Sequence, residues 1–117
     1  MSDQHEHDHR VDYIEFSATD LPATKAFYSS VFGWAFTDYG PEYTSFQDGR
    51  LAGGFAAAPS IQTGGPLIVI YAADLERTEG LVKQHGGTIV REAFSFPGGR
   101  RFHFADPSGN ELAVWSE

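Results

Sequence analysis

Ile14-Glu-Phe-Ser-Ala-Thr-Asp-Leu21 aligns with Ile68-Val-Ile-Tyr-Ala-Ala-Asp-Leu75 when the sequence is shifted against itself by 54 residues. In each copy an apolar run typical of a β-strand ends in Ala-x-Asp-Leu, and the same shift places Gly33 over Gly87. An aspartate after a strand favours the start of a helix, because its carboxylate accepts hydrogen bonds from the free N–H groups of the first turn. The alignment therefore indicates an internal duplication.

Each copy predicts the order β-α-β-β-β. The helices follow Asp20 and Asp74, and they end at Gly33 in the first copy and at Gly86 and Gly87 in the second. Three strand candidates follow each helix: 35–39, 42–48 and 51–58, then 88–95, 99–105 and 110–116. We therefore predict a single domain over residues 11–117, with a first module over 11–58, a turn-rich linker over 59–66 and a second module over 67–117.

The composition is that of one folded domain with acidic character. The 117 residues include 8 Lys and Arg against 16 Asp and Glu, which gives a formal net charge of −8. This excess of acid disfavours nucleic acid as a partner, because phosphate binding needs clustered basic side chains. The sequence has no cysteine, which excludes disulfides and thiol chemistry, and no apolar run of membrane-spanning length. We expect a cytoplasmic protein with no membrane partner.

Residues 1–10 are predicted to form a disordered tail rich in His, Asp and Glu. The run His5-Glu-His-Asp-His9 precedes the first strand and contains no apolar residue. Alternating histidines and acids can bind Zn²⁺ or Ni²⁺, so adventitious metal binding is the alternative to a purely solvated tail.

Two longer stretches carry a family resemblance. Tyr13-Ile-Glu-Phe-Ser-Ala-Thr-Asp-Leu-Pro-Ala-Thr-Lys-Ala-Phe-Tyr-Ser-Ser-Val-Phe-Gly-Trp34 resembles the opening of a glyoxalase-like module of the glyoxalase/bleomycin-resistance/extradiol-dioxygenase (vicinal oxygen chelate) superfamily. Phe104-Ala-Asp-Pro-Ser-Gly-Asn-Glu-Leu112 resembles the closing Asp-Pro-x-Gly-Asn hairpin of that family. The resemblance covers about residues 11 to 116. It implies an α+β fold of two tandem βαβββ modules, with eight strands in curved mixed sheets around a cleft and one helix outside each module.

The resemblance also implies where a metal would bind. In the family's metalloenzymes, His and Glu from four strands hold a divalent ion that acts as a Lewis acid. Carried over to this sequence, three of those positions fall on Tyr13, Leu67 and Ala113, and the fourth falls on the strand Leu51–Ala58, which has no donor side chain. We therefore expect no standard metal site and no cofactor, with a displaced divalent metal as the alternative. Family members commonly dimerise, so the resemblance also implies a homodimer.

Three side chains are candidates for acid–base chemistry or a non-standard metal site. Strand alternation places Glu15 on the face of Tyr13 and Glu111 on the face of Ala113, and His103 lies within reach of the same space. Two carboxylates and an imidazole can hold a divalent ion or exchange protons. The structural alternative is that Glu15 pairs with Arg100 or Arg101, that Glu111 is solvated, and that His103 is a half-buried strand residue.

The aromatic and acidic side chains predicted to face the cleft suggest its ligand. Aromatic walls with a few acids suit a flat or partly cationic organic molecule. The leading hypothesis is a small-molecule binding protein without metal, similar in logic to the bleomycin-resistance members. The alternatives are a glyoxalase-like lyase or isomerase, or a dioxygenase-related enzyme, and an interaction module completed by a partner. The predicted ligand-binding residues are Tyr13, Glu15, Leu67, Tyr71, His103, Glu111, Ala113 and Trp115.

Overall fold

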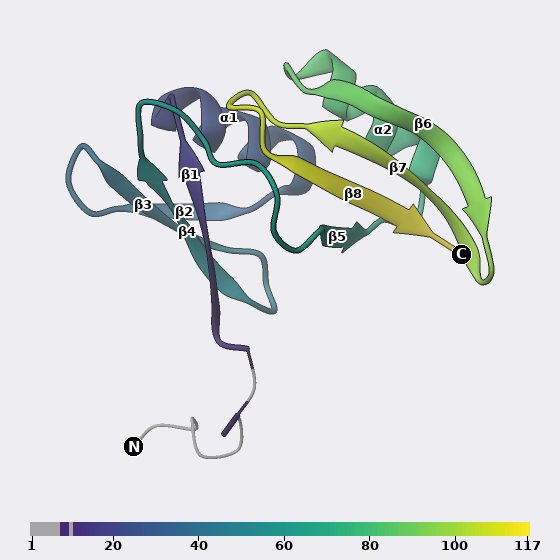
Figure 1. The fold of residues 1–117 in the computed structure, drawn as a ribbon, viewed down its shortest axis with the longest axis horizontal. Coiled ribbons are helices and arrows are strands. Elements are labelled where there is room, and N and C mark those ends of the chain that lie inside the picture. The colour runs from purple at the N-terminus through teal and green to yellow at the C-terminus, as the bar shows by residue number, and fades with distance from the viewer. Residues whose placement is uncertain (1–7, 10) are drawn as a thin grey trace.

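A computed structural model describes residues 8–9 and 11–117 of the chain, which forms two helices and eight strands (Figure 1). The elements in order are β1 (Tyr13–Ala18), α1 (Leu21–Phe32), β2 (Ala35–Asp38), β3 (Tyr43–Gln47), β4 (Ala52–Ala57), β5 (Ile68–Tyr71), α2 (Leu75–Gln84), β6 (Thr88–Phe96), β7 (Gly99–Ala105) and β8 (Glu111–Ser116). The predicted α+β fold of two tandem βαβββ modules is confirmed.

The two modules have the same sheet topology. The first sheet has the strand order β1-β4-β3-β2, and the second has the order β5-β8-β7-β6. In each sheet the first strand pairs in parallel with the last strand of its own module, and the remaining pairs are antiparallel. The predicted strand limits lie within one residue of those observed.

Both helices begin as the repeated Asp-Leu motif predicts. The Asp20 carboxylate accepts a hydrogen bond from the backbone N–H of Ala23 at 3.0 Å, and Asp74 accepts the equivalent bond from Arg77 at 3.1 Å. The helix α1 ends at Gly33, whose φ of 75° is the left-handed conformation that glycine adopts without strain. No helix in the described part of the chain is long and apolar enough to cross a bilayer.

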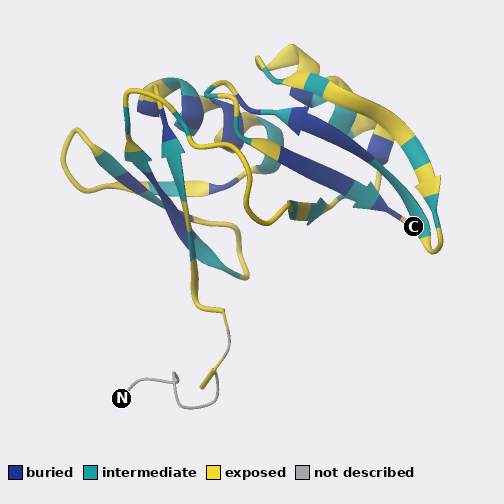
Figure 2. Ribbon diagram, viewed as in Figure 1, coloured by how far each residue is buried: buried dark blue, intermediate teal, exposed yellow. Residues whose placement is uncertain are grey.

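Most aromatic side chains fill the core between the helices and the sheets. The rings of Tyr28 and Phe46 stack on either side of Trp34, with centroids 4.6 Å and 4.4 Å away. The ring of Phe27 on α1 packs against that of Phe104 in the second sheet, with centroids 5.9 Å apart. The first helix therefore packs against both modules. Figure 2 shows the consequence: buried segments lie on α1, β4, β7 and β8, while β6 is largely exposed.

The Asp106–Asn110 turn joins the second module to the first. Asp106 is 4% exposed and accepts hydrogen bonds from the Tyr28 hydroxyl at 2.9 Å and from the backbone N–H groups of Ser108 and Asn110. The Asn110 side-chain amide donates to the carbonyl oxygen of Ser17 at 2.8 Å. Burial, the negative charge of Asp106 and the hydrogen bond to it raise the pKa of Tyr28 well above its usual value. This turn therefore links the two modules through buried and half-buried polar contacts.

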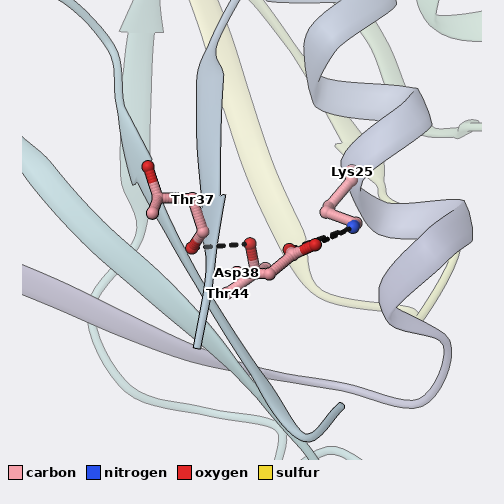
Figure 3. Close-up of polar contacts among 4 residues, drawn as sticks. All are labelled: Lys25, Thr37, Asp38 and Thr44. Atoms are coloured by element: carbon pink, nitrogen blue, oxygen red, sulfur yellow. Dashed lines mark hydrogen bonds and ion pairs between the residues drawn. The ribbon is translucent and has the colours of Figure 1, made fainter. Parts of the chain in front are cut away.

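An ion pair ties α1 to the edge of the first sheet (Figure 3). The Lys25 ammonium donates to both carboxylate oxygens of Asp38 at 3.0 Å. Beside it, the buried Thr44 hydroxyl donates to the carbonyl oxygen of Thr37. The second module has an equivalent ion pair, in which Arg100 Nη1 lies 2.6 Å from Glu76 Oε2.

Candidate functional site

A cleft of about 950 Å³ lies between the two modules. One wall is the edge strand β1, from Tyr13 to Ser17. The opposite wall includes His103 of β7, Gly109 and Asn110 of the turn before β8, and Glu111 at the start of β8. Residues 61–67 of the connection between the modules complete the lining. Because the Asp106–Asn110 turn fastens these walls to each other, the cleft is a direct result of how the modules join.

The first wall carries a hydrogen-bonded cluster of Tyr13, Tyr43 and Glu15. The two tyrosine hydroxyls bond to each other, and the Tyr43 hydroxyl donates to Glu15 Oε1 at 3.0 Å. The cluster lies over Gly54, where a Cβ atom would overlap both hydroxyls. Burial first, and then the hydrogen bonds to Tyr13 and Glu15, raise the pKa of Tyr43 above its usual range. The missing side chain at Gly54 is thus what makes room for the two phenols.

The opposite wall carries a histidine–carboxylate pair. His103 Nδ1 lies 2.9 Å from Glu111 Oε2, and the side chains are 11% and 50% exposed respectively. A carboxylate facing Nδ1 places the N–H there when the ring is neutral, which leaves the Nε2 lone pair available. Nε2 is buried and has no hydrogen-bond partner among the described residues. The arrangement can accept a proton or a hydrogen bond at Nε2.

The predicted site residues divide into two groups. The cleft is lined by Tyr13, Glu15, Leu67, His103 and Glu111. Tyr71, Ala113 and Trp115 share a sheet face with His103 but lie outside this lining. Ala113 is fully buried, and the Tyr71 hydroxyl donates to Glu117 at 2.8 Å instead of facing the cleft.

The side chains at the four family metal positions do not fit a divalent ion. Strand register identifies the fourth position: Glu15 pairs with Gly54 as its counterpart Val69 pairs with Ala113, so Gly54 and Ala113 are equivalent. Gly54, Leu67 and Ala113 offer no donor atom, and the Tyr13 phenol is bonded to Tyr43. Across the described residues, no group of three or more His, Cys, Asp or Glu side chains is placed to hold a metal.

One part of the structural alternative, the pairing of Glu15 with an arginine, is wrong. Glu15 does not pair with Arg100 or Arg101, because Arg100 contacts Glu76 across the second module while Glu15 accepts from Tyr43. Of the histidine run, residues 5–7 lie outside the described part of the chain. His9 is exposed and lies 3.3 Å from Asp8.

Two features of the site were not predicted from the sequence: Tyr43, which hydrogen-bonds to the lining residues Tyr13 and Glu15, and the part of the lining around Ile61. Tyr43 alternates with Thr44, which is buried, so the strand pattern places Tyr43 on the outer face but does not show that it reaches Glu15. The connection around Ile61 reads only as a turn-rich linker, and no local signal marks it as a cleft wall.

Comparison with known proteins gives the family. The mycobacterial protein CFP32 of Mycobacterium tuberculosis, whose name assigns it provisionally as a glyoxylase, is 28% identical over 114 residues, covering 88% of this chain. The match covers 44% of CFP32, so this chain spans less than half the length of that relative.

Solved structures show the same fold. A glyoxalase-related enzyme from Fulvimarina pelagi superposes with a TM-score of 0.79 at 22% identity, covering 93% of this chain and 88% of that one. The fosfomycin resistance protein FosX from Mesorhizobium loti gives a TM-score of 0.78 at 15% identity, with 93% and 92% covered. A sequence model of the Glyoxalase/Bleomycin resistance protein/Dioxygenase superfamily matches residues 10–114, and the chain therefore belongs to that superfamily.

Proposed function

We propose that the protein binds a small cationic organic molecule, with an aromatic or apolar part, in the cleft between its modules and without a metal ion. The observation that supports this most is the pair of exposed carboxylates, Glu15 and Glu111, on opposite walls of one cleft. Within the described chain, neither of them forms an ion pair with Lys or Arg.

The size and chemistry of the cleft agree with such a ligand. Pockets for organic molecules are typically about 300 to 1,000 Å³, so a volume of about 950 Å³ accommodates a drug-sized compound. Tyr13 and Leu67 supply an aromatic ring and an apolar side chain beside the acids. The net charge of −8 attracts a cation over long range, and a phenol ring stabilises it at short range.

The binding test uses benzyltrimethylammonium as the probe, followed by calorimetry and thermal shift. We expect saturable binding that Glu15→Gln and Glu111→Gln each weaken by about tenfold, because each removes one charge facing the ligand. Glu79→Gln on α2 is the matched control, since it changes the net charge equally outside the cleft lining. If all three variants weaken probe binding equally, the effect comes from the overall charge of the protein, and the proposal is contradicted.

A second arm tests the independence from metal. The full chain is dialysed against EDTA and titrated again with the same probe, with bound metal measured by mass spectrometry. We expect unchanged affinity, because the family ligand positions hold no donor set. Loss of binding that Mn²⁺ or Zn²⁺ restores would refute this part of the proposal.

The His103–Glu111 pair favours a second candidate function, proton transfer on a bound carbonyl compound. A neutral imidazole whose Nδ1–H is held by a carboxylate offers Nε2 as a base. The test is exchange of carbon-bound hydrogen for deuterium in dicarbonyl substrates, followed by NMR. Exchange that His103→Gln abolishes would support this function, whereas no exchange with any dicarbonyl would exclude it for that substrate class.

By family likeness we also propose that the chain forms a homodimer. Sedimentation equilibrium of the full chain tests this, with a mass of twice 12.8 kDa expected. A single monomeric species at high concentration would contradict it.

A further inference from the structure

We propose that Arg91 and Arg101 form a separate binding site for the carboxylate of a small aromatic acid, on the second sheet beyond the cleft. Neither arginine belongs to the cleft lining. The proposal is therefore independent of the function proposed for the cleft, and it concerns a ligand of opposite charge.

Strand register places the two arginines on one face. Arg101 pairs with Trp115 and His103 pairs with Ala113, so all four point away from the helices, opposite the buried Phe102. On β6, Arg91 pairs with His103 and Phe94 pairs with Arg101. The site is thus built from two neighbouring rows of side chains on β6, β7 and β8.

An irregularity in β6 brings Arg91 onto this face beside Phe94. Residues three positions apart in a regular strand point to opposite sides, which would separate Arg91 from Phe94. The register shifts between them, so that three steps along β6 match two along β7. An extra residue of this kind re-aims side chains and is frequent next to functional sites.

Both guanidinium groups lie near the ring of Phe94. The Arg91 guanidinium carbon lies 3.7 Å from the centroid of Phe94, and that of Arg101 lies 5.3 Å from it. Arg101 also lies 5.7 Å from the centroid of Phe96. Stacking uses the face of a guanidinium and leaves its in-plane N–H donors free, which is the geometry that a planar carboxylate accepts.

The two positive charges lack an acidic partner in the part of the chain that is described. Lys25 and Arg100 pair with Asp38 and Glu76, but neither Arg91 nor Arg101 forms an ion pair there. The Arg101 Nε atom is buried and has no hydrogen-bond partner among the described residues. In a chain of net charge −8, two neighbouring cations without a carboxylate are an arrangement that a bound anion would stabilise.

The surroundings select an aromatic body for the anion. Trp115 is half-buried beside Arg101 and lies 6.3 Å from Phe96. Tyr71, which is 52% exposed, meets Trp115 edge to face at 5.2 Å. These rings form an apolar surface next to the charges, and a flat ligand gains both stacking and ion pairing there.

The test is titration of the full chain with sodium benzoate, followed by calorimetry and by Trp115 fluorescence. We expect saturable binding that Arg91→Gln and Arg101→Gln each weaken by about tenfold or more, because each removes charge-assisted hydrogen bonds. Arg77→Gln, on the exposed side of α2, is the matched control for charge and should leave the affinity unchanged. Benzyl alcohol, which keeps the ring without the charge, should not bind saturably.

Several results would overturn the proposal. These are the absence of saturable benzoate binding, equal weakening by Arg77→Gln, and equal binding of benzyl alcohol. Thermal unfolding of each variant verifies folding. Arg91 is exposed, so its replacement keeps the test valid even if Arg101→Gln destabilises the sheet.

Discussion

The two modules share one backbone plan, but their outer sheet faces have diverged. In the first module, Gly54 leaves space that the Tyr13 and Tyr43 hydroxyls fill. In the second, the equivalent Ala113 lies beside His103, and charged side chains extend along β7 and β6. The inner faces of both sheets remain largely apolar. A duplicated fold thus preserves its core because packing demands it, while the outer faces are free to acquire different chemistry.

The largest expected effect concerns the turn between β7 and β8, which links the two modules, compared with the turn between β3 and β4. Asp106→Ala removes the acceptor of the Tyr28 hydroxyl and of two backbone N–H groups in a buried setting, so we expect a loss of about 3 kcal/mol or more in the free energy of unfolding. Urea denaturation measures it.

The matched control is Asp48→Ala in the first module. Asp48 also accepts two backbone N–H groups, from Arg50 and Leu51, but it is exposed and joins no second module. We expect a loss of about 1 kcal/mol. If Asp48→Ala and Asp106→Ala lower the free energy of unfolding equally, the contacts of Asp106 between the modules add no stability beyond those of an ordinary turn.

The buried phenol at the junction should make the protein sensitive to alkali. The pKa of Tyr28 is raised on folding, so its stabilising contribution is present below the ordinary tyrosine value of 10.0 and is lost as pH rises above it. Tyr28→Phe should therefore reduce the fall in stability between about pH 8 and about pH 11, measured by urea midpoints. If the stability of Tyr28→Phe falls as steeply with rising pH as that of the unchanged protein, the loss comes from another group.

A smaller effect is expected at the first outer face. Gly54→Ala introduces a methyl group that overlaps the tyrosine hydroxyls, and we expect it to cost about 1 kcal/mol because these side-chain ends can shift. In a Tyr43→Ala background the same replacement should cost less, since one of the overlapping groups is gone. Additive losses in the double variant would argue against the contact.

The smallest effects belong to the exposed ion pairs, one in each module. Asp38→Asn and Glu76→Gln should lower the melting temperature less than Gly54→Ala does, and 1 M salt should remove most of the difference. Hydrogen bonds to Lys25 and Arg100 lower the pKa values of Asp38 and Glu76, so each contribution is present above the ordinary carboxyl pKa and is lost as pH falls through the lowered value. An effect that persists at low pH would not come from the pair.

Much of the fold followed from the sequence by itself. The repeated Ala-x-Asp-Leu motif predicted two modules and both helix starts, because a capping aspartate and strand alternation are local properties of the chain. The residues at the family metal positions, such as Leu67 and Ala113, could be read directly, since a side chain without a donor atom has none in any fold.

The tertiary structure alone decided which side chains meet. Glu15 bonds to Tyr43, 28 positions away, and not to an arginine, because the strand order places β3 on the far side of β4 and Gly54 leaves the phenols room to cross it. The register shift in β6 turned Arg91 toward Phe94, which simple alternation does not predict. Such contacts depend on register, irregularities and missing side chains across strands far apart in sequence, and local patterns do not encode them.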